Sequence, residues 1–513
     1  MRNLISYTQR EKSKHYNITL VRVSCMGMMK LWKIERKDIV VCSYRNERKR
    51  VLTVCPKSPG HYKIVFNGNF FAEKSFNITQ DTYSRQIAYT IDKSELETGE
   101  QVVRWDLLKI EGSAMKTVLD GELVFEKLTA NDARNYTFWS CNQPFVDRAQ
   151  NVRKDVSGIY SWFSDTLRTL QPRVVIGLGD AVYADSDNSV NIVKIYQNQV
   201  RRKSYDKDEI GDLYKLNYIA HWSIHDFSAI LKTHPHIFTP DDHEYYDGYG
   251  SEPQADAKLE RLFSAGRLAA EEFILSGGPR FRKGLHAEAH QFFVEEPAAC
   301  FVFDSRESRH YKRSIMSERQ LKDFTEFLAK TEQNQNVRLL ILSVSVPLVF
   351  LRKGWEDFLA QVPDFVQDVF HFRDDVRDSW SSPGNIEYLR ILFELLRKLD
   401  SNRPDLQIVL ISGDIHVANA FSFKPRGFQR SLYQITSSSL CNPHHLPSFI
   451  RSVVAIPKGK YKEWNLYGTI RRLWEDVDKP NFLQCRVDGE GVVFILHVYD
   501  EESPMEKKLE ILF

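Results

Sequence analysis

Apolar positions divide the chain into a front section of short strand-like runs and a longer section in which strands alternate with helices. Between about residues 18 and 128, β-branched or aromatic runs are separated by Gly, Pro and Asp, a pattern typical of strands joined by turns. The runs are IVVCSY, RVLTVCP, HYKIVFNG, QIAYTID and GELVFEKL. We expect them to form a small β-sandwich, followed by a polar hinge at 129–135 (TANDARN).

In the second section, buried-strand patterns and helical patterns follow one another. The predicted strands are TFWSC (137–141), RVVIGLGD (173–180), HIFTPDD (236–242), CFVFDSR (300–306), VRLLILSVS (337–345) and LQIVLISGD (406–414). Helical patterns cover 158–170, 256–276 and 355–398. This alternation predicts βαβ units, and therefore an α/β fold. The tail, FLQCRVDGEGVVFILHVYD, predicts two strands about an Asp-Gly turn.

The length of the chain, 513 residues, exceeds that of one ordinary core, so we expect two or three folded units. The patterns predict a β-rich N-terminal domain (1–130), an α/β domain (131–450) and C-terminal strands (451–513) that complete the α/β domain. A hydrophobic share of 42% with 27% charged residues indicates a folded chain.

Charge and cysteine content exclude several classes of protein. Lys and Arg number 70 against 68 Asp and Glu. This balance gives no overall electrostatic field that would attract nucleic acid or anionic lipid. The run RNERKR (45–50) favours a solvated loop over a nucleic-acid or membrane contact. Seven scattered cysteines without a C-x-x-C spacing predict reduced thiols. Because the start lacks a signal-peptide pattern and no apolar run reaches about 18 residues, we expect a cytoplasmic protein.

Three segments carry candidate chemistry at strand ends, where ligands gather in open α/β sheets. In GLGDAVYAD, Asp180 projects from a strand tip and Tyr183 follows three residues later, so both could share one cation. A phenolate ligand favours ferric iron over calcium or magnesium. The alternative for this segment is an ordinary turn.

The second segment, TPDDHEYYDGY, places Asp241, Asp242, His243 and Glu244 directly after an apolar strand. Adjacent acids repel unless a cation or hydrogen bonds compensate them, which suggests a site. An exposed helix N-cap is the alternative.

The third segment, LQIVLISGDIHVAN, ends in Asp414 and His416, which alternation in an extended strand end would put on one side. Both could face a metal, although a satisfied core histidine is an equally good explanation for His416.

Together these segments resemble the calcineurin-like metallophosphatases, specifically the alkaline phosphatase D (PhoD-like) family. The matching motifs are G-D-x-x-Y at 179–183, D-D-H-E at 241–244 and S-G-D-x-H at 412–416. Further matches are SCNQPF (140–145), FDSRESR (303–309) and TSSSL (436–440). The resemblance implies a four-layer α/β/β/α sandwich core and makes 131–450 the catalytic domain.

The resemblance also implies roles for individual residues. The implied metal ligands are Cys141, Asp180, Tyr183, Asp242, Asp414 and His416. Asp180 would bridge two or more ions, Fe³⁺ plus a divalent ion (Ca²⁺, Zn²⁺, Mn²⁺ or Mg²⁺), with Tyr183 and Cys141 on the ferric side. His243 would protonate the leaving oxygen and Arg306 would bind phosphate oxygens, although a salt bridge between Arg306 and Asp304 is equally compatible with the sequence.

The function implied is a metal-dependent phosphoesterase that hydrolyses phosphate mono- or diesters through a metal-bridging hydroxide. Its substrate would be a small molecule or a phosphorylated macromolecule. A catalytically silent module that binds a phosphorylated ligand in the same crevice is the alternative. Two features depart from the family: the signal peptide of exported members is not visible, and Asp247-Gly248 stand where an Asn ligand is common.

Other motifs favour structural explanations. The pair His234 and His236 flanks a proline before a strand, and HAEAH (286–290) lacks the Glu of a helical zinc pair. Asp378 and Trp380 could belong to a lid over the crevice, but a packed surface helix is the simpler expectation.

Overall fold

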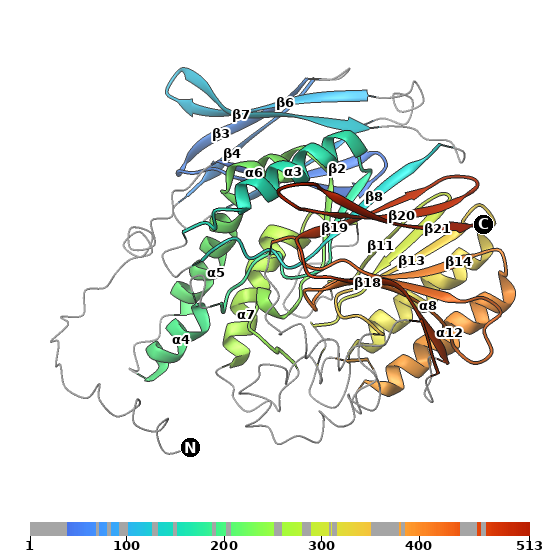
Figure 1. Cartoon of the computed structure of the whole chain (residues 1–513). Helices are drawn as coiled ribbons and strands as arrows, with labels where there is room; N and C mark the ends of the chain where they lie inside the picture. Colours follow the sequence, from blue (N-terminus) through green and yellow to red (C-terminus); the bar gives the residue numbers. More distant parts are fainter. Residues whose placement is uncertain are drawn as a thin grey trace, which may run out of the picture.

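The described residues form a mixed α/β structure with three β-sheets (Figure 1). The computed structural model describes residues 38–67, 71–79, 84–91, 101–125, 132–146, 151–186, 191–201, 207–250, 259–279, 289–306, 309, 315–349, 379–380, 385–441, 459–462 and 468–513.

The first sheet contains nine strands and joins the two ends of the chain to its middle. Its order is β21 (Met505–Leu512), β20 (Gly491–Val498), β19 (Asn481–Val487), β8 (Arg134–Trp139), β9 (Val174–Gly177), β10 (His236–Phe238), β1 (Ile39–Asn46), β2 (Lys49–Cys55) and β5 (Arg85–Thr90). Strands β8, β9, β10 and β1 are parallel neighbours, and the others pair antiparallel. The predicted hairpin about the Asp-Gly turn is confirmed as β19 and β20.

The second sheet contains eight strands, with four parallel strands at its centre. Its order is β11 (Gln291–Glu295), β12 (Ala298–Val302), β13 (Leu339–Val344), β14 (Gln407–Ser412), β16 (Leu432–Thr436), β15 (Ala418–Lys424), β18 (Thr469–Val477) and β17 (Gly459–Lys462). The parallel neighbours are β12, β13, β14 and β16. The strands expected near 300, 340 and 410 are therefore confirmed.

The third sheet contains four antiparallel strands and lies at the top of Figure 1. Its order is β4 (Phe71–Ile78), β3 (Gly60–Asn67), β6 (Gln101–Glu111) and β7 (Ala114–Phe125). A buried cluster that includes Ile64 and Trp105 of this sheet and Val40 and Leu52 of the first sheet joins the two. The β-rich front is thus present, but β1, β2 and β5 continue the nine-stranded sheet. The proposed boundary near residue 130 stays a prediction.

Helices pack against each of the two large sheets. The α-helices are α3 (Val156–Leu170), α4 (Ile192–Arg201), α5 (Lys207–Trp222), α6 (His225–Thr233), α7 (Leu259–Ala270), α8 (Glu318–Gln333) and α12 (Ile386–Asn402), with a 3₁₀ turn η1 (Asp242–Glu244) and a π-helical turn η2 (Glu271–Leu275). The helices predicted at 158–170 and 256–276 are confirmed by α3 and by α7 with η2. Of the stretch 355–398, the structure describes only 379–380 and α12 onward.

Three buried clusters hold these layers together. One contains Phe138 and Ile176 of the first sheet with Val302 and Ile411 of the second, so the two sheets share a buried cluster. A second joins α3, α5, α6 and α7 to the nine-stranded sheet, and a third joins α8 and α12 to the eight-stranded sheet. Burial of apolar side chains in such clusters is the dominant favourable contribution to the free energy of folding.

Two expectations about the chain can be compared with the described residues. Among them no helix is long and apolar enough to cross a membrane. The six described cysteines are buried and free, as reduced thiols would be, while Cys25 lies outside the described residues.

Candidate metal centre

The predicted ligands come together because the strands that precede them end at one edge of the structure. Cys141 follows β8, Asp180 follows β9 and Asp242 follows β10, and these strands are parallel neighbours. Backbone hydrogen bonds tie the first two segments beyond the strands, since the Asn142 N–H donates to the Asp180 carbonyl over 2.8 Å. The third segment arrives from β14 of the other sheet.

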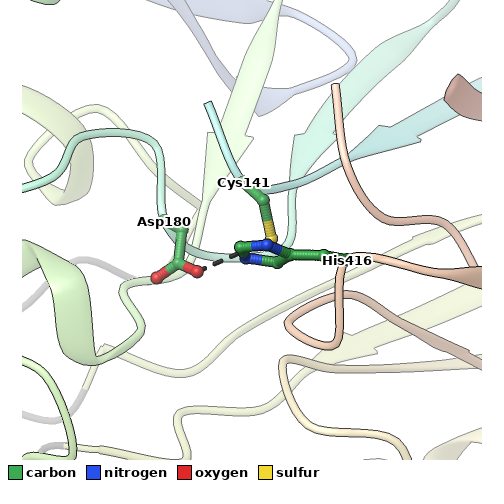
Figure 2. Close-up of side chains that lie close together, drawn as sticks. All are labelled: Cys141, Asp180 and His416. Carbon is green, nitrogen blue, oxygen red and sulfur yellow. Dashed lines mark hydrogen bonds between the residues drawn. The ribbon is translucent and has the colours of Figure 1, made fainter. Parts of the chain in front are cut away.

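One group of side chains contains a thiol, a carboxylate and an imidazole. Potential ligand atoms of Cys141, Asp180 and His416 all lie within 4.8 Å of one another (Figure 2). The Tyr183 hydroxyl joins them, 3.3 Å from Asp180 Oδ2 and 3.3 Å from His416 Nε2. Four predicted ligands from three distant segments therefore share one small volume.

A second group contains acids. Carboxylate oxygens of Asp180, Asp241, Asp242 and Asp414 lie within 4.8 Å of one another, and so do ligand atoms of Asp180, Asp242 and His243. Asp180 belongs to both groups, while the bridging position predicted for it stays a prediction.

The chemistry of this donor set fits metal ions. Asp180 is 1% exposed, and its Oδ1 has no hydrogen-bond partner among the described residues. Burial, together with nearby Asp241 and Asp242, raises the pKa of Asp180 well above its usual range, although His243 opposes this. Buried carboxylates at this spacing need a positive charge to remain ionised, and a bound cation would supply it.

The two other carboxylates among the predicted ligands, Asp242 and Asp414, differ in their surroundings. Burial, Asp241 and Asp242 raise the pKa of Asp414 well above its usual value. Burial alone would raise the pKa of Asp242, but the Arg306 guanidinium, His243 and the Gly248 N–H lower it to about 2. Asp242 is therefore held ionised by the protein itself.

The backbone at the predicted ligands adopts an unusual conformation. Cys141, Asp180, Asp414 and His416 have φ values of 56°, 54°, 67° and 53°. Among the described non-glycine residues, the only other positive φ belongs to Gln171 at the end of α3. Left-handed conformations are sparsely populated and cluster at functional sites. Asp414 and His416 therefore reach the site by left-handed turns, so the extended strand end that we predicted for them is wrong.

Two glycines allow these turns to approach one another. A Cβ at Gly179, whose φ is 113°, would lie 2.5 Å from the Asp241 Cβ, and a Cβ at Gly413 would lie 2.6 Å from the Ser140 Cβ. The Gly179-Asp180 pair is a turn, as the alternative explanation for that segment held, but a turn packed against the segment that carries Asp241.

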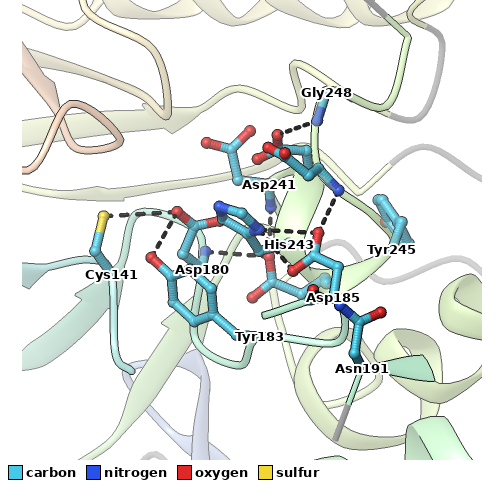
Figure 3. A network of polar contacts seen from close by, with 12 residues as sticks. Cys141, Asp180, Tyr183, Asp185, Asn191, Asp241, His243, Tyr245 and Gly248 are labelled. Atoms are coloured by element: carbon cyan, nitrogen blue, oxygen red, sulfur yellow. Dashed lines mark hydrogen bonds and ion pairs between the residues drawn. The ribbon is translucent and has the colours of Figure 1, made fainter. Parts of the chain in front are cut away.

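His243 is held by an acid that the sequence analysis did not assign a role. Its Nδ1 lies 2.8 Å and 3.0 Å from the two carboxylate oxygens of Asp185 (Figure 3). Burial would lower the pKa of His243, but Asp185, Asp180 and Asp242 raise it well above its usual value. The available signal was the acid at the end of GLGDAVYAD, two residues after Tyr183.

Glu244 was also missed as a positioning group. Its carboxylate accepts backbone N–H groups of Asp180 (3.1 Å), Ala181 (2.6 Å) and Asp241 (2.7 Å). Asp241 is the N-cap of η1 and forms a capping box with Glu244, so the N-cap alternative holds for this segment, but Asp241, Asp242 and Glu244 are buried rather than exposed.

Comparison with known proteins agrees with this geometry. Residues 137–273 match the model of the PhoD-like phosphatase family. The family match therefore covers this section of the chain, which contains the first two ligand segments. The match includes Cys141, Asp180, Tyr183, Asp242 and His243, whereas Arg306, Asp414 and His416 lie outside it and are brought to the site by the fold.

Two individual proteins are similar to this chain. An uncharacterized protein of Saccharomyces cerevisiae, YGR266W, is 21% identical over 330 residues, 50% of this chain and 46% of that protein. The chain thus spans about half the length of this curated relative. A solved structure of PhoD has the same fold, with a TM-score of 0.61 and 13% identity over 91% of this chain and 88% of that chain.

Arg306 lies at the site, but its guanidinium contacts acids. It is fully buried, pairs with Asp241, and approaches Asp242 Oδ1 to 3.5 Å. The Asp304 carboxylate instead accepts the Arg306 backbone N–H over 3.0 Å. The salt bridge that we considered therefore exists, but with Asp241 rather than with Asp304.

The remaining motifs have structural contacts. His290 of HAEAH pairs with Asp323 at 3.0 Å, while His286 lies outside the described residues. His234 and His236 are buried, and burial lowers their pKa values to about 4 and about 3. Trp380 is buried and donates to the Val346 carbonyl over 3.1 Å, whereas Asp378 lies outside the described residues.

Proposed function

We propose that this chain is a metal-dependent phosphoesterase that hydrolyses phosphate mono- or diesters. The PhoD-like phosphatase family and fold suggest activity on phosphoric esters. The observation that carries the proposal is the convergence of thiol, phenol, imidazole and carboxylate groups from distant segments on the buried carboxylate of Asp180, whose Oδ1 has no hydrogen-bond partner among the described residues. The four-layer α/β/β/α order implied by the resemblance is part of this proposal.

The residues divide into two sides about Asp180. Cys141, Tyr183 and His416 would hold one ion, and the phenol and thiol favour Fe³⁺ there. Asp242 and Asp414 would hold a divalent ion on the other side. The bound ions would supply Lewis acidity and a water of lowered pKa.

His243 is the proposed general acid. Because Asp185 engages Nδ1, the proton available for transfer is the one at Nε2, and Asp185 keeps the imidazole charged and fixed in orientation. His243 would give that proton to the leaving oxygen of the ester. Asp185 is a positioning residue in this scheme.

Arg306 has a different proposed role from the phosphate binding that we predicted. Its guanidinium is buried against Asp241 and Asp242, where it offsets their charge and fixes their positions. These contacts support a role for Arg306 in holding the segment that carries Asp241 and Asp242.

Metal content and hydrolysis, measured together, test the proposal. Protein purified without chelator should contain metal and hydrolyse p-nitrophenyl phosphate, its bis ester or both. Asp180→Asn should lose metal and at least about 100-fold in kcat, as loss of a metal-supporting group does. Asp165→Asn, at an exposed side chain paired with Arg168 on α3, should retain both.

Two results would contradict the proposal. Metal-replete wild-type protein that hydrolyses neither ester while binding phosphate would favour the silent binding module. Unchanged metal content in Asp180→Asn would mean that Asp180 is not a metal ligand.

A further inference from the structure

We infer that Asn217 and His221 of α5 position Tyr183 for metal binding by holding both polar groups of its main chain. This inference rests on the proposed function, because it concerns how a proposed ligand is oriented. The two residues lie one helical turn apart on the face of α5 that meets the turn after β9. Both are buried, at 2% and 0% exposed.

The contacts form a clamp on the Tyr183 backbone. The Tyr183 N–H donates to His221 Nε2 over 3.4 Å, and the Tyr183 carbonyl accepts from Asn217 Nδ2 over 3.0 Å. His221 Nδ1 lies 2.9 Å from the Asn217 carbonyl, to which it donates. With Nδ1 protonated, the lone pair of the neutral imidazole is at Nε2, where the Tyr183 N–H needs an acceptor.

The orientation of the imidazole is fixed by a neighbour from another ligand segment. The Phe145 ring packs edge-on against His221, with centroids 4.8 Å apart and planes at 80°. Phe145 belongs to the segment that begins with Cys141. The clamp is thus supported from the same side of the structure that supplies the thiol.

Fixing the main chain of Tyr183 on both sides fixes the direction in which its side chain leaves the backbone. The ring then brings its hydroxyl to 3.3 Å from both Asp180 Oδ2 and His416 Nε2. A functional constellation tolerates errors of roughly 0.5 Å or 10–20°. Loss of either clamp bond would let the turn rotate and move the hydroxyl out of that range.

A double-mutant cycle tests the clamp, with the affinity of the metal-free protein for Zn²⁺, measured by calorimetry, as its readout. His221→Phe keeps the ring contact with Phe145 but removes the acceptor, and should weaken Zn²⁺ binding about 10-fold, as loss of an outer-shell partner does. In a Tyr183→Phe background it should cause no further loss, because the group it positions is already absent. His221→Gln, which retains an acceptor, should recover most of the affinity.

Two further variants separate positioning from folding. Asn217→Leu removes the donor to the Tyr183 carbonyl, and its folding cost is limited because Asn217 Oδ1 has no partner among the described residues. It should lower the affinity as His221→Phe does. His236→Phe, at an equally buried histidine whose Nδ1 bonds the His234 carbonyl, should leave the affinity unchanged.

The outcomes distinguish this inference from the proposed function. Wild-type affinity in His221→Phe, or an equal loss in the Tyr183→Phe background, would overturn the clamp while leaving the proposed function intact. Wild-type protein that binds no metal would overturn both.

Discussion

At the scale of single residues, the site depends on backbone conformations that most side chains avoid. Left-handed geometry costs roughly 1–2 kcal/mol per residue for L-amino acids. Cys141, Asp180, Asp414 and His416 all adopt it. Such strain persists only where surrounding contacts hold the backbone, and here Glu244 and the neighbouring turns do so. This backbone conformation directs the four side chains toward one another.

Gly179 is the residue at which this close packing can be tested. Gly179→Ala adds a Cβ that would lie 2.5 Å from the Asp241 Cβ, on a backbone whose φ is 113°. We expect a loss of about 2–5 kcal/mol in unfolding free energy, from backbone strain plus overpacking, and a loss of bound metal. Urea unfolding and metal analysis measure the two effects.

Gly112→Ala is the matched control for the cost of backbone strain without overpacking. Its φ is 65°, but no atom lies within 4 Å of the added Cβ. Gly112→Ala should lower the unfolding free energy by about 1 kcal/mol and leave the metal content unchanged. If Gly179→Ala were no more destabilising than this control, the contact with Asp241 would have no energetic role.

At the scale of elements, the sequence predicted which strands carry the site but not all of its groups. Asp180, Asp242 and Asp414 could be found because each follows a strongly apolar strand. Asp185 and Glu244 could not be assigned, because their partners are an imidazole 58 residues away and backbone N–H groups of another segment. Polar residues in loops have no periodicity that reveals such partners.

Glu244 provides a test at this scale, because its carboxylate joins the turn after β9 to η1. Glu244→Gln preserves the shape, but either orientation of the amide faces an NH₂ group toward at least one of three backbone N–H donors. A buried N–H group that loses its acceptor costs about 1–3 kcal/mol. We therefore expect a loss of about 1–3 kcal/mol in unfolding free energy, together with reduced metal content, by urea unfolding and elemental analysis.

Glu271→Gln supplies the comparison for Glu244→Gln. Glu271 is also buried but faces Arg267 at 3.7 Å, outside the candidate metal centre. It should lower stability without changing the metal content. Equal metal loss in both variants would mean that Glu244 acts only through global stability.

At the scale of the whole molecule, the sequence predicted the strands but not the sheets to which they belong. The run IVVCSY has the local pattern of any buried strand, yet its pairing with β10 joins positions about 190 residues apart, Ser43 and His236. Pairing at that distance depends on the complete hydrophobic core, so local pattern alone could not reveal it. The front of the chain and the candidate catalytic section therefore share one sheet.

His236 lies at this junction, and its burial predicts how the molecule responds to acid. Burial lowers the pKa of His236 to about 3, whereas an unfolded histidine titrates near its usual value of 6.5. Between these values the unfolded chain binds more protons, so stability is fully present above about pH 6.5 and is lost as the pH falls toward 3. At pH 5 the loss from this residue is about 2 kcal/mol. His236→Phe should remove that part of the difference between urea unfolding at pH 7.5 and pH 5, while His225→Phe, at an exposed side chain, should keep it. An unchanged pH difference in His236→Phe would mean that the protonation of this junction does not limit the acid stability of the joined sheet.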